Sequence, residues 1–345
     1  MDYGGYFEGI VGHEFQKQAL WRAVCEGRVS HAYMFSGMEG IGKRLVATGF
    51  AKCLNCLELG RRKGEEIHEK CGCFSCKKIE KGVHPDVFLV EYEGVRDIKV
   101  NQVREEIEER IFLRPFEGRY KVAVIDEAER MNVSAQNAFL KTLEEPPVDS
   151  VIVLVTSRPE FLLPTIHSRC QRIEFKPLPF NLIREELVKR GLSNEEAHIA
   201  SMLSGGSLGK AICIDRGLLT ERKNIIEAIC NLRTIRDISG ISRVVEHVLG
   251  KGHLDNTERV SFFLQLIAFW LRDLMYVKIG VKEDQISNRD LLPVIKKAAG
   301  RFSLSGILEI LSFLEEAWYV IFRGNANKQI VLENLLVKII DATGD

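Results

Sequence analysis

A glycine-rich stretch that ends in lysine could bind phosphate. Residues 37–43 read Gly-Met-Glu-Gly-Ile-Gly-Lys and fit the first seven positions of the pattern G-x-x-x-x-G-K-[ST]. In such a loop the glycines let backbone N–H groups turn toward phosphate oxygens, and the lysine reaches the outer phosphates. The alternative is a plain turn that joins a strand to a helix. The residues expected to contact phosphate are Gly37, Gly40, Gly42 and Lys43.

The eighth position of this pattern departs from the rule. A serine or threonine there normally places a hydroxyl on Mg²⁺, but this sequence has Arg44. Arginine carries a positive charge and has no acceptor oxygen, so it cannot coordinate the metal. We therefore expect no productive hydrolysis of Mg·ATP. ATP is a doubtful ligand, because the sequence leaves open whether nucleotide still enters the loop.

Acidic residues follow a short apolar run farther along the chain. Residues 122–125 lead directly into Asp126 and Glu127. In a working ATPase such an aspartate orients the Mg²⁺ ligands and the glutamate polarises the attacking water. Acidic residues also favour the start of a helix because of its dipole. Their position behind a phosphate loop, at the end of an apolar run, favours the nucleotide-site interpretation.

Four cysteines lie close together between positions 56 and 76. Cys56 is followed after fourteen residues by Cys71, Cys73 and Cys76, and Cys53 lies three residues before Cys56. In a cytosolic chain such a cluster predicts metal before disulfides. Four thiolates would complete a closed tetrahedral zinc site with a structural role. The alternatives are unliganded buried cysteines, or a ligand set in which Cys53 replaces Cys56 or Cys71.

The elements that must position these residues alternate between strands and helices. Apolar runs at 121–125 and 150–156 suit strands buried on both faces of a parallel sheet, and a short apolar run precedes the glycine loop. Helical patterns at 100–110 and 134–144 lie between these runs. This alternation predicts a doubly wound α/β domain over residues 1–177.

The second half of the chain is helical in pattern. Pro177 and Pro179 mark a boundary. We expect a small helical domain at 178–213 and a larger all-α domain at 214–345. The most apolar stretch, 262–276, is broken by charged residues and is too short to span a bilayer, so it predicts a buried helix. No signal segment opens the chain, which favours a cytoplasmic protein with no membrane partner.

The charge balance bears on nucleic-acid binding. The 345 residues include 48 Lys and Arg and 48 Asp and Glu, so the net charge is zero. A protein that grips DNA unaided usually carries a basic surplus. A zinc-dependent nucleic-acid-binding module is therefore the weaker alternative. The mixed run of basic residues at 61–63 and acidic residues at 65–66 is typical of a solvated face.

Several longer motifs resemble the bacterial clamp-loader family of AAA+ proteins. They are His-Ala-Tyr-Met-Phe-Ser-Gly at 31–37, Asp-Glu-Ala-Glu-Arg-Met at 126–131, Asn-Ala-Phe-Leu-Lys-Thr-Leu-Glu-Glu-Pro-Pro at 137–147 and Leu-Pro-Thr-Ile-His-Ser-Arg-Cys at 163–170. The resemblance implies an AAA+ α/β P-loop domain with a zinc module inserted at about 53–80, a helical lid domain and a C-terminal helical collar domain. It also implies a hetero-pentamer with gamma/tau and delta subunits of the DNA polymerase III holoenzyme. That assembly would load the sliding clamp on primed DNA, which the chain would reach through the complex.

Departures from the family pattern select a type of subunit. ATP-hydrolysing gamma or tau subunits have Ser or Thr after the loop lysine and an arginine in a G-S-x-R run. Here the run is Gly-Ser-Leu-Gly-Lys at 206–210, with Gly209 at the arginine position. Two ATPase elements are therefore missing. The resemblance favours a delta-prime-like stator, and an ATP-hydrolysing gamma/tau-type subunit is the alternative.

The same resemblance assigns roles to two further residues. Arg169 lies in the Ser-Arg-Cys run at 168–170 and matches the arginine that reaches into the ATP site of an adjacent subunit. A planar guanidinium would stabilise charge on the γ-phosphate during transfer. Thr156 matches the sensor position at the end of a strand. An ordinary salt-bridged surface arginine is the alternative for Arg169.

Overall fold

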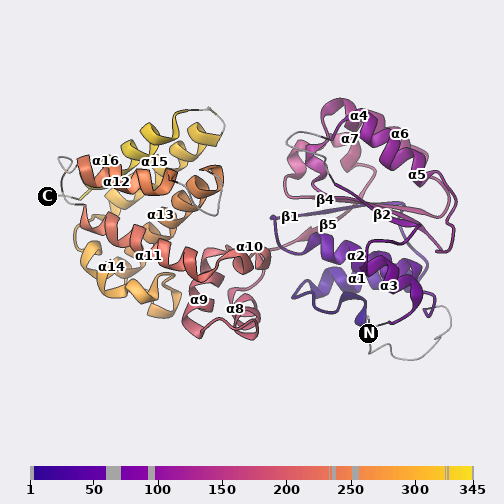
Figure 1. Cartoon of the computed structure of the whole chain (residues 1–345), viewed down its shortest axis with the longest axis horizontal. Helices are drawn as coiled ribbons and strands as arrows, with labels where there is room; N and C mark the ends of the chain where they lie inside the picture. Colours follow the sequence, from indigo (N-terminus) through magenta and orange to yellow (C-terminus); the bar gives the residue numbers. More distant parts are fainter. Residues whose placement is uncertain are drawn as a thin grey trace. The chain divides into compact units, whose positions relative to one another are not determined.

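The structure, a computed structural model, describes residues 4–59, 71–91, 98–232, 234, 238–250, 256–322, 324 and 326–343. The α/β unit comprises Met1–Leu182 and Gly206–Lys210, and the helical unit comprises Ile183–Gly205 and Ala211–Asp345 (Figure 1). The predicted division into three domains, at 177 and 213, remains a prediction. Residues 60–70 of the predicted zinc module, including its mixed charge run, lie outside the described residues.

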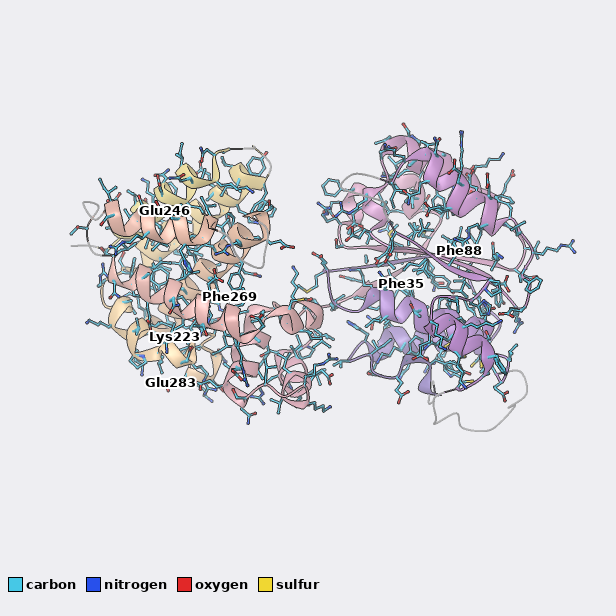
Figure 2. The ribbon with its side chains drawn as sticks, viewed as in Figure 1. Phe35, Phe88, Lys223, Glu246, Phe269 and Glu283 are labelled. Carbon is cyan, nitrogen blue, oxygen red and sulfur yellow. The ribbon has the colours of Figure 1, made fainter. Side chains whose placement is uncertain are left out.

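The α/β unit is built on a five-stranded parallel sheet with the order β2-β3-β4-β1-β5. Its strands are β1 (Ala32–Gly37), β2 (Val87–Val90), β3 (Lys121–Ile125), β4 (Ser150–Thr156) and β5 (Gln171–Phe175). Every residue of β3 and β4 is buried, as their unbroken apolar runs predicted. The side chains of Phe35 on β1 and Phe88 on β2 are buried as well (Figure 2). The predicted parallel α/β architecture is therefore confirmed.

Helices cover both faces of this sheet (Figure 1). One face carries α1 (Glu14–Cys25), α2 (Lys43–Asn55) and α3 (Phe74–Glu80). The other carries α4 (Val100–Gln102), a π-helical segment Val103–Glu108, α5 (Glu109–Ile111), α6 (Val133–Glu144) and α7 (Pro164–His167). A core cluster that includes Ile107, Phe139 and Ile152 joins the second set of helices to the strands. The helix predicted at 100–110 is thus continuous but contains a π-helical centre.

The described residues from 180 onward are mainly helical and are joined by turns. The helices are α8 (Phe180–Lys189), α9 (Asn194–Leu203), α10 (Leu208–Cys213), α11 (Arg216–Asn231), α12 (Ile238–Leu249), α13 (Asn256–Ile279), α14 (Leu292–Ala299), α15 (Leu304–Phe322) and α16 (Lys328–Asp341). The predicted C-terminal helical region is confirmed. On α16, Leu332, Leu335, Leu336 and Ile339 are buried, whereas Ile330 is exposed.

A long apolar helix lies in the core of the helical unit. Helix α13 is longer than the predicted run 262–276, and Thr257–Ile279 meets the length and composition of a membrane span. Half of its most apolar window is nevertheless buried inside the protein, and Trp270, Leu271 and Leu274 are at most 1% exposed. Asp273 is also fully buried. The helix therefore serves as a core helix, as predicted.

Candidate functional site

The phosphate loop connects the end of β1 to the start of α2. Gly37 (φ 151°) and Gly40 (φ 72°) adopt backbone conformations that favour glycine. A Cβ at Gly37 would also clash with the carbonyl oxygen of Phe175. The Nζ atom of Lys43 donates to the carbonyl oxygens of Gly37 (2.6 Å) and Met38 (2.8 Å). The lysine is thus held by its own loop.

A second segment of the α/β unit packs directly on this loop. The backbone N–H of Gly209 donates to the carbonyl oxygen of Gly40 (2.8 Å), and Oγ of Ser207 donates to that of Glu39 (2.8 Å). A Cβ at Gly209 would lie 2.7 Å from the carbonyl oxygen of Gly40. A side chain at position 209 would therefore have to displace the phosphate loop.

The carboxyl ends of three neighbouring strands meet beside the loop. A cavity of ≈ 270 Å³ opens there. It is lined by Glu39, Gly40, Gly42, Lys43, Arg44, Leu45, Asp126, Glu127, Glu129, Val155, Thr156 and Ser157. The fold thus brings together the predicted residues of the phosphate loop, the acidic strand end and the sensor position, with Gly37 placed at the end of β1.

Arginines pair with both acidic residues that the sequence singled out. The Arg44 guanidinium pairs with Glu91 and lies 3.4 Å from Oδ2 of Asp126. Glu127 pairs with Arg130 and has a left-handed backbone conformation (φ 47°). Arg44 therefore places positive charge beside the carboxylate that would orient Mg²⁺ in a working ATPase.

Glu129 is a lining residue that the sequence reasoning did not assign. Its Oε1 accepts bonds from Oγ (2.6 Å) and N (3.1 Å) of Ser157. Burial acts to raise the pKa of Glu129, but bonds from Ser157 and Thr156 outweigh it and lower that pKa. The buried Lys43 has a lowered pKa because burial outweighs the attraction of Glu129 and Asp126. The only sequence signal for Glu129 was its place two residues after Glu127.

Arg169 and the phosphate loop lie at opposite ends of the parallel strands. Arg169 precedes β5, the edge strand, whose Gln171 pairs with Tyr33 and whose Phe175 pairs with Gly37. Because the strands are parallel, Arg169 is at their amino ends and the loop is at their carboxyl ends. Strand β5, which has five residues, lies between them and spans roughly 17 Å at about 3.3 Å per residue. Arg169 is therefore not positioned to act on its own loop.

The guanidinium of Arg169 is held by two elements. Its NH2 group lies 2.6 Å from Oε1 of Glu144, the last residue of α6. Its NH1 group donates to the carbonyl oxygen of Thr165 on α7 (2.9 Å) and to Oγ of Ser168 (3.2 Å). One third of the side chain remains exposed. The arginine is thus oriented but accessible.

The four predicted metal ligands converge between α2 and α3. The Sγ atoms of Cys56, Cys71, Cys73 and Cys76 all lie within 4.8 Å of one another. Cys56 is 3.4 Å from Cys71 and 4.0 Å from Cys73. A tetrahedral zinc with Zn–S bonds of about 2.3 Å would set sulfur atoms about 3.8 Å apart. The residues therefore fit a zinc ion, and the fully buried Cys53 lies outside this group.

The surroundings of the cluster favour negative charge on sulfur. The Tyr6 hydroxyl donates to Sγ of Cys56 (3.1 Å), and the backbone N–H of Cys76 lies 3.5 Å from Sγ of Cys73. Hydrogen bonding from Cys76 lowers the pKa of the Cys56 thiol to about 4, while the same contact raises the pKa of Cys76. One thiolate is thus stabilised by its neighbours, and a bound cation would let all four ionise.

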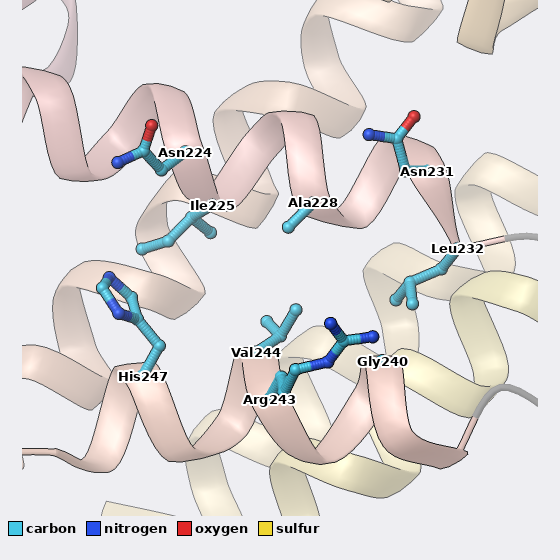
Figure 3. A pocket seen from close by; sticks show the side chains of 9 residues that line it. All are labelled: Asn224, Ile225, Ala228, Asn231, Leu232, Gly240, Arg243, Val244 and His247. Carbon is cyan, nitrogen blue, oxygen red and sulfur yellow. The ribbon is translucent and has the colours of Figure 1, made fainter.

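A separate cavity lies between α11 and α12 of the helical unit (Figure 3). Its volume is ≈ 490 Å³. Ile225 and Val244 contribute apolar surface, and the exposed Arg243 and His247 lie along α12. The site residues predicted from the sequence all belong to the α/β unit, so this cavity has no part in the predicted chemistry.

A phosphate loop between β1 and α2, with acidic residues at the end of β3 and Thr156 at the end of β4, defines the P-loop class of nucleotide-binding domains. Comparison with known proteins narrows this class. Residues 12–179 match the family "DNA polymerase III, delta subunit", and residues 217–341 match "DNA polymerase III, delta subunit, C terminal". Both halves of the chain therefore match the same polymerase subunit.

Individual relatives agree with this result. The chain is 31% identical over 337 residues to the DNA polymerase III subunit delta′ of Bacillus subtilis, covering 93% of this chain and 94% of that protein. It is 29% identical over 334 residues to the delta′ subunit of Pseudomonas aeruginosa, covering 93% and 95%. The tau subunit of B. subtilis is 35% identical over 220 residues, which cover 61% of this chain and 38% of tau. The chain belongs to the DNA polymerase III delta′ family and is a delta′-like clamp-loader subunit, as its motifs predicted.

Among solved structures, a DNA polymerase III gamma subunit-related protein from Thermotoga maritima superposes with a TM-score of 0.43. It is 19% identical in sequence, and the superposition covers 94% of this chain and 99% of that one.

Proposed function

We propose that this delta′-like subunit is a stator that activates a neighbouring ATP site without hydrolysing ATP itself. It would join gamma/tau and delta subunits in a cytoplasmic hetero-pentamer that loads the sliding clamp on primed DNA. The observation that carries this proposal is the separation of Arg169 from its own phosphate loop by the length of the sheet. An accessible arginine at the amino ends of the strands is suited to reach the ATP site of an adjacent subunit.

The chemistry of Arg169 follows from its guanidinium. The transferring γ-phosphoryl group carries negative charge on its oxygens, and a planar, permanently charged fork stabilises that charge. Lysine has the charge but not the fork. We therefore assign Arg169 as an arginine finger that acts in trans.

Three features in and around the chain's own phosphate loop support the absence of ATP turnover. Arg44 replaces the Mg²⁺-binding hydroxyl and lies beside Asp126. Gly209 stands where gamma and tau subunits have an arginine, and its backbone bonds to the loop. Lys43 is engaged by loop carbonyl oxygens. These features argue against the alternative, an ATP-hydrolysing gamma/tau-type subunit.

The cysteine cluster supports a further part of the proposal. Cys56, Cys71, Cys73 and Cys76 would hold one zinc ion with a structural role, because four thiolates leave no position for water or substrate. The ion would tie the end of α2 to the start of α3. It supplies no chemistry to ATP hydrolysis in this proposal.

The test is Arg169→Ala in a loader reconstituted with gamma/tau and delta subunits. Removing an arginine finger should slow hydrolysis at the facing site by on the order of 10³-fold. Total ATPase should fall only partly, because the other sites have their own fingers, and clamp loading should fall more. Arg169→Lys should not restore the rate.

Arg172→Ala removes an exposed arginine from β5 and is the matched control. An Arg169→Ala loader that assembles and loads clamps at the wild-type rate would refute the proposal.

A further inference from the structure

We propose that Glu144 is a positioning residue that fixes the guanidinium of Arg169 before it meets the neighbouring ATP site. This inference rests on the proposed arginine-finger role and adds a second residue to it. Glu144 would not contact nucleotide. It would act only through the orientation of Arg169.

The first observation is the place of Glu144 in its helix. It is the last residue of α6, and Glu145 follows it directly. The C-terminal end of a helix carries partial negative charge, so carboxylates there are unfavourable and cations are preferred. Local rules of this kind are broken most often where function requires it. The described partner of Glu144 at this end is Arg169.

The second observation is the geometry of the contact. Glu144 approaches NH2 of Arg169 at 2.6 Å, while Thr165 accepts from NH1 at 2.9 Å. Two acceptors on different elements, α6 and α7, fix both the direction and the plane of the guanidinium. Oγ of Ser168 also accepts from NH1 (3.2 Å), so Glu144 is needed to hold the NH2 side of the guanidinium. The planar fork of Arg169 is thereby oriented at the surface of the α/β unit.

Orientation matters because the arginine stem is flexible. An arginine that must order its stem during the reaction loses conformational entropy, and small errors in placement lower rates strongly. A partly exposed ion pair such as this one contributes little to folding stability. Loss of Glu144 should therefore leave folding and assembly intact and change only the rate at the facing site.

The experiment is a double-mutant cycle in the reconstituted loader. Single-turnover ATP hydrolysis is measured for Glu144→Ala, Arg169→Ala and the double variant, with assembly checked by size-exclusion chromatography. Glu145→Ala is the matched control, since it removes the same charge one residue later. We expect Glu144→Ala to slow the facing site about tenfold through misplacement of the finger, with ATP affinity unchanged. Glu144→Gln should also be slowed, because it keeps the shape and loses the charge.

The cycle separates this inference from the proposed function. In the Arg169→Ala background, Glu144→Ala should have no further effect. If it slows that background equally, Glu144 acts independently of Arg169 and the inference is wrong. Wild-type or faster hydrolysis by Glu144→Ala, in a loader that Arg169→Ala slows, would also overturn it while leaving the finger intact. If Arg169→Ala itself has no effect, the proposed function fails and this inference fails with it.

Discussion

Arg44 is the residue that most directly distinguishes this nucleotide site from one that hydrolyses ATP. Its guanidinium lies beside Asp126 and pairs with Glu91, so it lies where a Mg²⁺ ion and its hydroxyl ligand are expected. Gly209 adds a second obstacle, because its backbone is bonded to the loop. Under the proposed function, we expect each of them alone to prevent turnover.

Restoring one element at a time should therefore fail. We predict that Arg44→Thr and Gly209→Arg, made singly, each leave ATP turnover by the isolated chain at background. The Arg44→Thr variant still lacks an arginine at position 209. The Gly209→Arg variant forces a Cβ to within 2.7 Å of the Gly40 carbonyl oxygen and displaces the loop. Phosphate release measures both, with Arg44→Lys as the control that keeps the charge. Turnover by either single variant at the rate of a competent loader ATPase would show that the site is not degenerate.

At this scale the sequence predicted which residues meet, but not how the loop is held. Lys43 and Asp126 were assigned to one site from the glycine loop and the acidic end of a buried strand, and Thr156 was assigned from the resemblance to the clamp-loader family. The bond from Ser207 to Glu39 spans 168 residues, and no local pattern encodes it. Its detection requires the folded chain.

Helix α3 depends on the cysteine cluster at its start. Cys73 is the N-cap residue of α3, and Cys76 lies in its first turn. We predict about one zinc ion per wild-type chain, and loss of most of it in Cys73→Ser, by elemental analysis. Amides of α3 should then exchange faster with solvent. Cys53→Ser should keep its zinc, and so should the control Cys25→Ser. Wild-type protein without zinc would contradict this prediction.

The turn before β3 depends on one buried carboxylate. Oxygens of Asp86 accept from the backbone N–H groups of Phe116 (2.8 Å), Glu117 (2.8 Å) and Gly118 (2.7 Å). Lys121 also pairs with it (3.1 Å). Burial alone would raise the pKa of Asp86, but these bonds lower it to about 2. The carboxylate therefore stabilises the fold when it is ionised.

The pH dependence of this contribution has a defined sign. The folded pKa lies below the unfolded value of about 3.9, so the stabilisation, about 2 kcal/mol, is complete above pH 4 and lost as the pH falls through 2. We predict that Asp86→Asn destabilises the α/β unit at pH 7 and removes this acid-sensitive contribution. Hydrogen exchange of the amides at 116–118 reports the effect locally, with the exposed Asp284→Asn as the control. Unchanged exchange at pH 7 would contradict the assignment.

The sequence predicted strands unevenly, and burial explains the difference. Strands β3 and β4 were predicted at their observed bounds because they are buried on both faces and read as unbroken apolar runs. The edge strand β5 was not predicted, since most of its residues are exposed and Arg172 and Glu174 interrupt its apolar pattern. Strand β2 was not predicted either, because it has only four residues. The π-helical centre of 100–111 was also missed, because side-chain periodicity hardly changes over one such turn.

The charge of the whole molecule limits what it can do alone. Equal numbers of basic and acidic residues give no overall attraction to a phosphate backbone. A subunit that reaches DNA through an assembly does not need such attraction. The molecule as a whole is therefore poorly suited to holding DNA unaided.

This reasoning predicts weak DNA binding by the isolated chain. Nonspecific binding gains its free energy from released counterions, so affinity falls steeply with salt in proportion to the phosphates neutralised. Without a basic surplus, we expect no retention of primed duplex DNA at micromolar chain and physiological salt, with dissociation constants no tighter than about 10⁻⁴ M. A fluorescence-anisotropy titration at several salt concentrations measures this binding, with the reconstituted loader as the positive control.

Cys73→Ser should give the same result as the wild type, because the cysteine cluster has no assigned nucleic-acid contact. Tight, steeply salt-dependent binding that Cys73→Ser abolishes would instead support a zinc-dependent nucleic-acid-binding module.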